Sequence, residues 1–293
     1  MTGEEGVVAD FVGRFARNPT DGFGSEPETG RVVMSKKRLV VAGEDRTTIP
    51  LSEVVDVVGG NVPPGFRDLF DSTVTIGYKA QHGTVETVLI EGGEETISKF
   101  RTVLFKALLN GTNAKVKHPA RIGGRVVDSP VRAAKLSISP KHVAFKTKRG
   151  SFKIELTTVI GFDRSERALD ESARPTLLIR HADGGQATTT LLSPISTRRL
   201  NLLGRYLRIE YGTLLESVSD LDLSEPETRL LVTIYTTDGD IDFASVLDGD
   251  AARVTNILNS LRKKDLIEER GADISLTSQG QIVVSQRIED VNI

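Results

Sequence analysis

The chain of 293 residues contains one pattern of residues twice. Alternating apolar and polar residues between positions 30 and 54 recur between positions 134 and 159. The two sets keep the same order at an offset of 104 residues, which rises to 105 after one insertion. The matched positions are Ser35, Lys37, Leu39 and Val41 with Ser139, Lys141, Val143 and Phe145, and then Ile49, Leu51 and Val54 with Ile154, Leu156 and Val159. Such a duplication predicts two modules of one fold, because each copy repeats the same core positions.

Each copy has the pattern of several strands followed by one helix. Period-two alternation predicts strands at Thr73–Tyr78 and Val85–Ile90 in the first copy, and at Thr176–His181 and Gln186–Leu192 in the second. Apolar residues at helical spacing then predict a closing helix in each copy: Phe100, Leu104 and Leu108 before Gly111, and Leu200, Leu203, Leu207 and Tyr211 before Gly212. A small curved sheet closed by one helix resembles the pleckstrin-homology (PH) or GRAM type of module. The residues that carry this resemblance are Gly30 to Leu39 and Ile49 to Leu51.

Residues 216–293 follow a helical period instead. Ser224 and Glu227 have the spacing of a capping box, which predicts a helix start. Further helices are predicted over Ile241–Leu247 and from Asp250, followed by a two-stranded wing that turns at Gly271 and a last helix from Ser278 to about Asp290. This order predicts a winged helix-turn-helix. The predicted fold class is therefore α+β, with tandem PH/GRAM-like modules at residues 1–112 and 113–215, each closed by a C-terminal helix, and a winged helix-turn-helix at residues 216–293.

The residues that catalytic and metal sites require are absent or scattered. There is no cysteine, so thiolate nucleophiles, zinc ribbons and iron–sulfur sites are excluded. No phosphate-binding loop ending in Gly-Lys-Ser/Thr, no Gly-x-Ser-x-Gly and no His-Glu-x-x-His occurs, and the four histidines stand singly. We expect no enzyme activity, no metal and no cofactor. The acidic start and the lack of a run of about 18 apolar residues predict a cytoplasmic protein without membrane insertion.

Charge is distributed unevenly along the chain. Residues 216–293 carry 16 acidic and 7 basic side chains, a net charge of −9, whereas residues 1–215 carry +7. The negative charge of the C-terminal segment opposes nucleic-acid binding, because affinity for nucleic acid grows with the phosphates that a protein neutralises. We therefore expect no nucleic-acid partner, although a winged-helix transcriptional regulator that binds DNA remains the alternative function.

The steepest basic stretch runs from Lys115 to Lys153 and contains eleven Lys or Arg residues and one acid, Asp128. Alternation along a strand places its lysines on the face opposite the apolar residues. This predicts a docking surface for an acidic protein, which such charges would attract and orient. The alternatives are a solvated face without a partner and a lipid surface. The candidate residues are Lys135, Lys146, Lys148, Arg149 and Lys153.

A second candidate surface lies on the helix that begins near Asp250. Its predicted outward face is polar and carries little charge, which favours a protein partner. Solvent exposure alone and contact with DNA phosphates are the alternatives. The candidate residues are Arg253, Asn256, Asn259, Ser260 and Lys263.

Several strings together resemble the CheF family, the archaeal adaptors between the chemotaxis system and the archaellum motor. The resemblance covers essentially the whole chain. It rests on Gly30 to Leu39, Arg46 to Val54, Ala107 to Leu109, and Lys117-His-Pro-Ala120 followed by Gly123-Gly124. It implies a non-catalytic adaptor for chemotaxis and motility that binds the phosphorylated response regulator CheY and relays the signal to the cytoplasmic ring proteins of the archaellum. Such a protein is expected at the cell pole or the motor through its partners.

Overall fold

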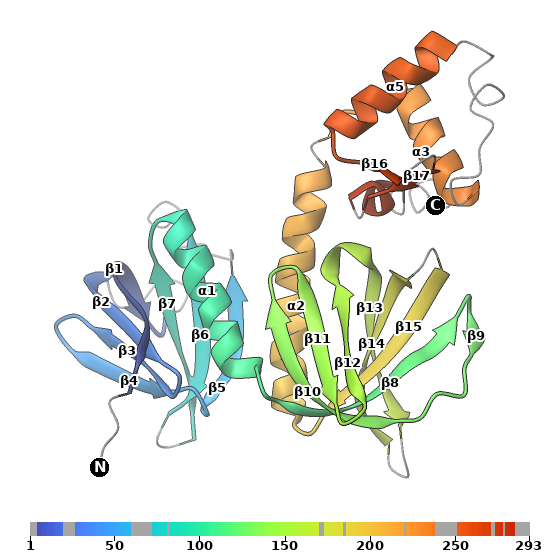
Figure 1. Ribbon diagram of the computed structural model, residues 1–293. Coiled ribbons are helices and arrows are strands. Elements are labelled where there is room, and N and C mark those ends of the chain that lie inside the picture. The colour runs from blue at the N-terminus through green and yellow to red at the C-terminus, as the bar shows by residue number, and fades with distance from the viewer. Residues whose placement is uncertain are drawn as a thin grey trace. The chain divides into compact units, whose positions relative to one another are not determined.

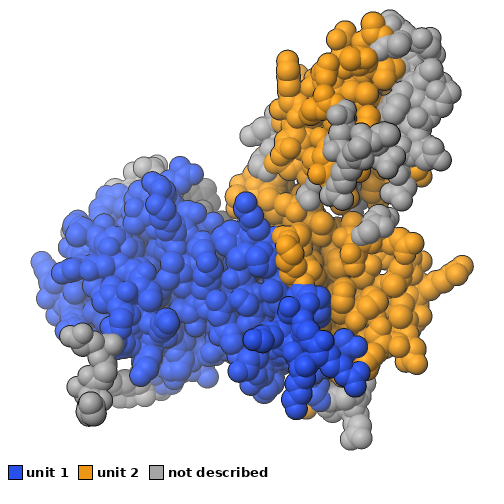
Figure 2. All heavy atoms as spheres, in the orientation of Figure 1, with its two compact units in different colours: residues 1–115, 132–152, 193–209 blue, residues 116–131, 153–192, 210–293 orange. Residues whose placement is uncertain are grey.

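Figure 1 shows the computed structural model, and Figure 2 shows the two compact units into which the chain divides. One unit comprises residues 1–115, 132–152 and 193–209, and the other comprises residues 116–131, 153–192 and 210–293. The structure describes residues 5–19, 27–59, 72–80, 83–169, 173–183, 186–219, 221–237, 251–270, 273–277 and 279–284. Within these ranges, no helix has both the length and the apolar character needed to cross a membrane. The predicted domain boundaries after residues 112 and 215 stay a prediction.

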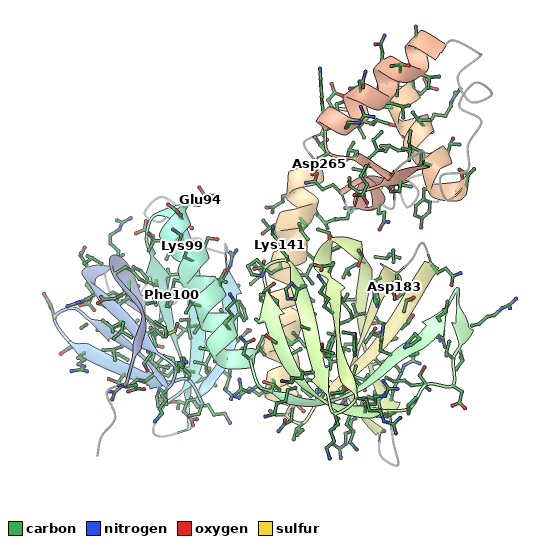
Figure 3. The ribbon with its side chains drawn as sticks, in the orientation of Figure 1. Glu94, Lys99, Phe100, Lys141, Asp183 and Asp265 are labelled. Atoms are coloured by element: carbon green, nitrogen blue, oxygen red, sulfur yellow. The ribbon has the colours of Figure 1, made fainter. Side chains whose placement is uncertain are left out.

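The first sheet has seven antiparallel strands in the order β4-β3-β2-β1-β7-β6-β5. Its strands are β1 (Val7–Arg17), β2 (Glu28–Ser35), β3 (Arg38–Ala42), β4 (Arg46–Pro50), β5 (Val54–Gly59), β6 (Thr73–Lys79) and β7 (Val85–Glu91). Helix α1 (Glu94–Leu109) follows β7 and buries an apolar stripe. Phe100 of that stripe, labelled in Figure 3, packs edge-on against Phe11 of β1 with ring centroids 5.3 Å apart. One helix therefore closes the first copy, as predicted.

The second sheet has eight strands, seven of them in the order β12-β11-β10-β8-β15-β14-β13, with β9 paired to β8. The strands are β8 (Asn113–Ile122), β9 (Arg125–Val126), β10 (Arg132–Ser139), β11 (His142–Thr147), β12 (Gly150–Glu155), β13 (Val159–Ala168), β14 (Ala173–Asp183) and β15 (Gln186–Pro194). A short 3₁₀ helix, η2 (Leu156–Thr158), precedes β13, and α2 (Thr197–Ser219) follows β15.

Strand order and register confirm the internal duplication. When β9 is set aside, the two sheets connect their strands in the same sequence, so β1 corresponds to β8, β2 to β10 and β3 to β11. Arg31 pairs with Ala42 in the first sheet, and Lys135 pairs with Lys146 in the second. Both residues of the pair are displaced by the 104 positions predicted from the sequence. The two hairpins therefore share one backbone register and differ in their side chains.

The predicted fold class, an α+β chain of two PH/GRAM-like modules and a winged helix-turn-helix, is wrong. The described chain is mostly antiparallel β-structure in three sheets, and no winged helix-turn-helix is present in it. The β-content was underestimated because β1 and β8, which lie inside their sheets, were not predicted. Gly13 interrupts the alternation of β1, and Pro119 interrupts that of β8. Gly13 is required there, since a Cβ atom would lie 2.4 Å from the carbonyl oxygen of Glu91 on β7.

The C-terminal segment contains α3 (Glu225–Thr237), α5 (Ala251–Lys263) and an antiparallel ribbon of β16 (Ile267–Arg270) and β17 (Asp273–Leu276). The predicted middle helix at Ile241–Leu247 lies outside the described residues. Of the predicted last helix, residues 279–284 are described and helical. The described residues therefore do not show a winged helix-turn-helix, the fold on which the DNA-binding alternative was based.

Helix α2 does not end before Gly212 as predicted but continues to Ser219. A glycine inside a helix costs about 1 kcal/mol relative to alanine. The residues after Gly212 offset this cost by burial, because Leu214 and Leu215 pack against the apolar core of the C-terminal segment, which includes Leu230 and Leu261. Tertiary packing therefore overrides the local stop signal.

The N-terminal part of α2 binds the edge strand β5 of the first sheet. Arg198 donates to the carbonyl oxygens of Leu51 and Val54, and Arg205 donates twice to the carboxylate of Asp56, at 3.0 Å each. These bonds cover backbone acceptors at a sheet edge that would otherwise be open to strand pairing.

We expect the Arg205–Asp56 pair to contribute little to stability, because both side chains are about 40% exposed. A double-mutant cycle with Arg205→Ala and Asp56→Ala should give a coupling free energy of about 0.5–1 kcal/mol in urea unfolding. A coupling near zero would show that the pair does not hold α2 on β5.

Candidate functional site

The β10–β11 hairpin separates apolar and basic residues onto opposite faces. Leu136, Val143 and Phe145 are buried, whereas Lys135 and Lys146 are exposed and lie directly opposite each other. Phe145 stacks on Phe152 of β12 with ring centroids 4.8 Å apart, which fixes β11 against β12 on the buried side. The sequence prediction of the outward lysines is confirmed in this respect. Lys141, labelled in Figure 3, lies at the turn that joins β10 to β11.

The turn between β11 and β12 presents two further cations. The hydroxyl of Thr147 accepts from the backbone N–H of Arg149 at 3.2 Å and donates to the carbonyl oxygen of Gly150 at 2.9 Å. Gly150 has φ = +141°, a conformation that favours glycine. Lys148 and Arg149 are exposed on this turn. We call Lys135, Lys146, Lys148 and Arg149 the basic hairpin.

The basic hairpin is not neutralised within the described part of the chain. None of the ion pairs found there involves its four cations, and Lys135 faces Lys146 across the strand pair. Like charges directly opposite each other destabilise a strand pair. Lys153, the fifth predicted residue, lies on β12 and forms an ion pair with Glu155. The four cations therefore keep their charge without an ion pair among the described residues, whereas Lys153 shares its charge with an acid of the same strand.

The first copy shows that the fold does not require this charge. At the position equivalent to Lys146 it has Ala42, and the turn that follows carries Glu44 and Asp45 where the second copy has Lys148 and Arg149. The equivalent of Lys135 is Arg31, which donates twice to Asp10 at 2.7 Å. The corresponding hairpin thus carries two acids and a hydrogen-bonded arginine in one copy, and in the other it carries cations that have no ion pair among the described residues.

The second candidate surface lies on α5. Arg253, Asn256, Asn259 and Lys263 are exposed, and the amide oxygen of Asn259 accepts from Arg262 at 3.0 Å. Ser260 is half-buried and donates to Glu227 of α3 at 2.7 Å. The structure therefore places four of the five predicted residues at the surface and uses the fifth within the C-terminal segment.

Glu227 was predicted only as a helix cap, but it also holds two helices together. Its carboxylate accepts from the backbone N–H and the hydroxyl of Ser224, from Ser260 and from Lys264, all within 2.8 Å. Burial would raise the pKa of Glu227, but the hydrogen bonds from Lys264, Ser260 and Ser224 outweigh burial and lower its pKa to about 2. The carboxylate stays ionised and links the start of α3 to the end of α5.

Two histidines that the sequence separates by 63 positions meet in the second sheet. The hydroxyl of Thr190 lies 2.8 Å from Nδ1 of His118 and 3.1 Å from Nε2 of His181, and the two rings stack with centroids 5.8 Å apart. Thr190 can donate to only one ring. No sequence signal indicated this cluster, because β8 and β14 lie on either side of β15, the strand of Thr190, only through the topology of the sheet. No group of three or more His, Asp or Glu side chains in the described ranges is placed to hold a metal ion.

The buried His181 makes stability depend on pH. Desolvation lowers its pKa below 6.5, and the backbone of Ala182 and the charge of Asp183 oppose this only in part. The unfolded chain binds a proton near pH 6.5, so the contribution of neutral His181 is complete above that pH and is lost as the pH falls toward the folded-state pKa. We expect the free energy of unfolding to fall between pH 7.5 and 5.5, by no more than about 1.4 kcal/mol per pH unit.

Urea titrations at these two pH values, followed through the methyl NMR signals of Leu177 and Ile179, would measure the effect. The variant His181→Gln should show a smaller difference between the two pH values. An equal difference in both proteins would assign the pH dependence to another group.

Comparison with known proteins gives one consistent result. Residues 7–213 match the family of the archaeal chemotaxis signal transduction system protein F. The chain is 41% identical over 290 residues to taxis protein CheF2 of Halobacterium salinarum, which covers 99% of both chains. It is 26% identical over 298 residues to taxis protein CheF1 of the same organism, which covers 99% of this chain and 100% of that protein.

Proposed function

The chain belongs to the archaeal chemotaxis signal transduction protein F family, and within this taxis system we propose that it is a non-catalytic adaptor. In this role it binds the phosphorylated response regulator CheY and relays the signal to the cytoplasmic ring proteins of the archaellum motor. It reaches the motor through these partners. The observation that carries the proposal is the basic hairpin, because four exposed cations without an ion pair among the described residues suit an acidic protein surface.

We assign the response regulator to the basic hairpin. Response regulators are acidic around the phosphorylated aspartate, so the hairpin would both accelerate the encounter and orient the partner. Lys153 contributes less in this arrangement, because Glu155 already neutralises part of its charge. The buried side of the hairpin is held by the Phe145–Phe152 stack, so binding needs little ordering of the backbone.

We assign the motor proteins to the exposed face of α5, with Arg253, Asn256, Asn259 and Lys263 as the contact residues. Ser260 supports this face through its hydrogen bond to Glu227. The C-terminal segment has a net charge of −9. Its overall charge is therefore opposite to that of the basic hairpin, which favours different partners for the two surfaces.

Calorimetry with the full chain would test the relay. We expect CheY activated with beryllofluoride to bind at least about tenfold more tightly than CheY without activation. The activated form should change the affinity of the chain for the motor ring proteins, and the ring proteins should change the affinity for CheY by the same factor. Equal affinity for both forms of CheY, or no coupling to the ring proteins, would refute the proposed relay.

A further inference from the structure

A concave site lies on the second sheet, on the side opposite the buried Ile179 and His181. It encloses about 500 Å³, and all of its lining residues, between 117 and 126 and between 162 and 191, belong to one unit. This volume is within the range of sites that bind ligands or peptide side chains. Strands β13, β14 and β15 form its floor, and the β8–β9 hairpin, drawn at the end of the sheet in Figure 1, forms a wall.

The register of the strands defines the floor. Asp163, Leu178 and Leu191 form one row across β13, β14 and β15, and Gly161, Arg180 and Thr189 form the next. Residues that pair in this way point to the same side of a sheet. A Cβ atom on Gly161 would lie 3.1 Å from Nη2 of Arg180, so glycine leaves room for the arginine to lie across β13. The floor is therefore two leucines beside a cation.

The wall supplies an exposed apolar residue. Val126 of β9 is 71% exposed and pairs with Arg121 of β8. Gly123, at the tip of this hairpin, donates its N–H to the carbonyl oxygen of Ala187 on β15 at 2.9 Å, which ties the wall to the floor. This wall includes the segment from Lys117 to Gly124, which is one of the segments that carry the family resemblance in the sequence.

Four cations line the site: Lys117, Arg121, Arg167 and Arg180. Asp163 is the one carboxylate among the lining residues, and none of the ion pairs in the described ranges involves any of these five groups. A rim with this excess of positive charge around an apolar floor needs an occupant that is anionic at its edges and apolar at its centre.

We propose that this site, which we call the sheet pocket, binds an acidic peptide segment of a partner protein, with an apolar side chain anchored on Leu178 and Leu191. A phosphate group alone fits less well. Lys117 and Arg121 are four residues apart on β8, a span of about 13 Å along a strand, and Arg167 lies four residues beyond Asp163 on β13. The cations therefore surround the leucines instead of meeting above one point. A peptide with carboxylates on both sides of an apolar residue would engage both the rim and the floor.

The sheet pocket is separate from the proposed response-regulator site, since no residue of the basic hairpin lines it. It gives an adaptor a further docking surface for an acidic segment, and it does not depend on where CheY binds.

Fluorescence anisotropy with the full chain would test the pocket. The probe is a short fluorescein-labelled peptide that alternates glutamate and leucine, compared with versions in which lysine replaces glutamate or serine replaces leucine. We expect binding of the first peptide alone, with shifts of the methyl NMR signals of Leu178, Leu191 and Val126. Arg180→Glu and Arg121→Glu should each raise Kd at least about tenfold.

Arg125→Glu is the matched control, because Arg125 is exposed on the same hairpin and does not line the pocket. It should raise Kd by about twofold at most. Unchanged methyl signals of Leu177 and Ile179 on the buried face would show that each variant is folded. The triple variant Lys146→Glu, Lys148→Glu and Arg149→Glu should bind the peptide as the wild type does, whatever its effect on CheY.

Three results would overturn the proposal. The first is no binding of the glutamate–leucine peptide. The second is equal weakening by Arg125→Glu and Arg180→Glu, which would indicate unspecific attraction. The third is equal binding of the glutamate–serine peptide, or full displacement by millimolar inorganic phosphate, which would indicate a site for small anions only.

Discussion

The triple variant Lys146→Glu, Lys148→Glu and Arg149→Glu is expected to lower the association rate constant with activated CheY by about a hundredfold. In the proposed function, the wild-type cations would attract the acidic surface of the response regulator over a range set by the Debye length, and the variant would repel it. All three residues are exposed, and none takes part in an ion pair among the described residues, so the fold should be retained. Stopped-flow measurement at low and high salt would determine the rate constants.

The duplication supplies a control with the same change in net charge. Lys36, Lys37 and Arg46 are exposed cations of the first copy, and the variant that reverses all three should lower the rate constant by a few-fold at most. The difference between the two variants should shrink in 1 M salt, where the Debye length is about 3 Å. Similar rate constants for both variants would remove the basic hairpin as the docking site and leave the family assignment intact.

Replacement of Glu227 by glutamine should destabilise the packing of α3 against α5 by about 3 kcal/mol. The carboxylate accepts four hydrogen bonds, and an amide would turn its NH₂ group toward donors from Ser224, Ser260 or Lys264. Hydrogen exchange of the α3 and α5 amides would measure the loss locally, which suits a chain with more than one folded unit.

The pH dependence of that exchange gives a second readout. The folded-state pKa of Glu227, about 2, lies below its usual value of 4.5, so the network contributes fully above pH 4.5 and is lost as the pH falls toward 2. Glu227→Gln should lose this dependence. Glu225→Gln is the control, because Glu225 is exposed in the same turn and its one ion pair among the described residues is with Arg229; it should cost about 0.5 kcal/mol or less. An equal loss of stability in Glu227→Gln and Glu225→Gln would show that the hydrogen bonds of Glu227 do not hold α3 against α5.

The sequence was sufficient to predict features that depend on local alternation or on self-similarity. The hairpin β14–β15, the closing helix α1 and the exposure of Lys135 and Lys146 follow from period-two or helical patterns within short windows. The register shared by β2–β3 and β10–β11 follows from the 104-residue offset. In each case the information lies within one segment or in the comparison of two copies.

Features that depend on contacts between distant segments could not be predicted. Strand β8 contains Pro119, and its place between β10 and β15 comes from sheet topology instead of its own pattern. Helix α2 continues through Gly212 because Leu214 and Leu215 pack, partly buried, against the core that includes Leu230 of α3. The meeting of His118 with His181 arises only when β8 and β14 lie on either side of β15, and the rows that form the sheet pocket arise only when β13, β14 and β15 are neighbours. Tertiary burial decided each of these outcomes.

The equivalence of the two hairpins allows a graft. Because Ala42 has the register of Lys146, and Glu44 and Asp45 lie in the turn that corresponds to that of Lys148 and Arg149, the variant Ala42→Lys, Glu44→Lys and Asp45→Arg would place three similar cations on the other copy. A chain with two such faces could engage two response-regulator molecules, or one dimeric molecule with greater avidity. The natural chain, in which Glu44 and Asp45 oppose this, would thereby limit each adaptor to a single response regulator.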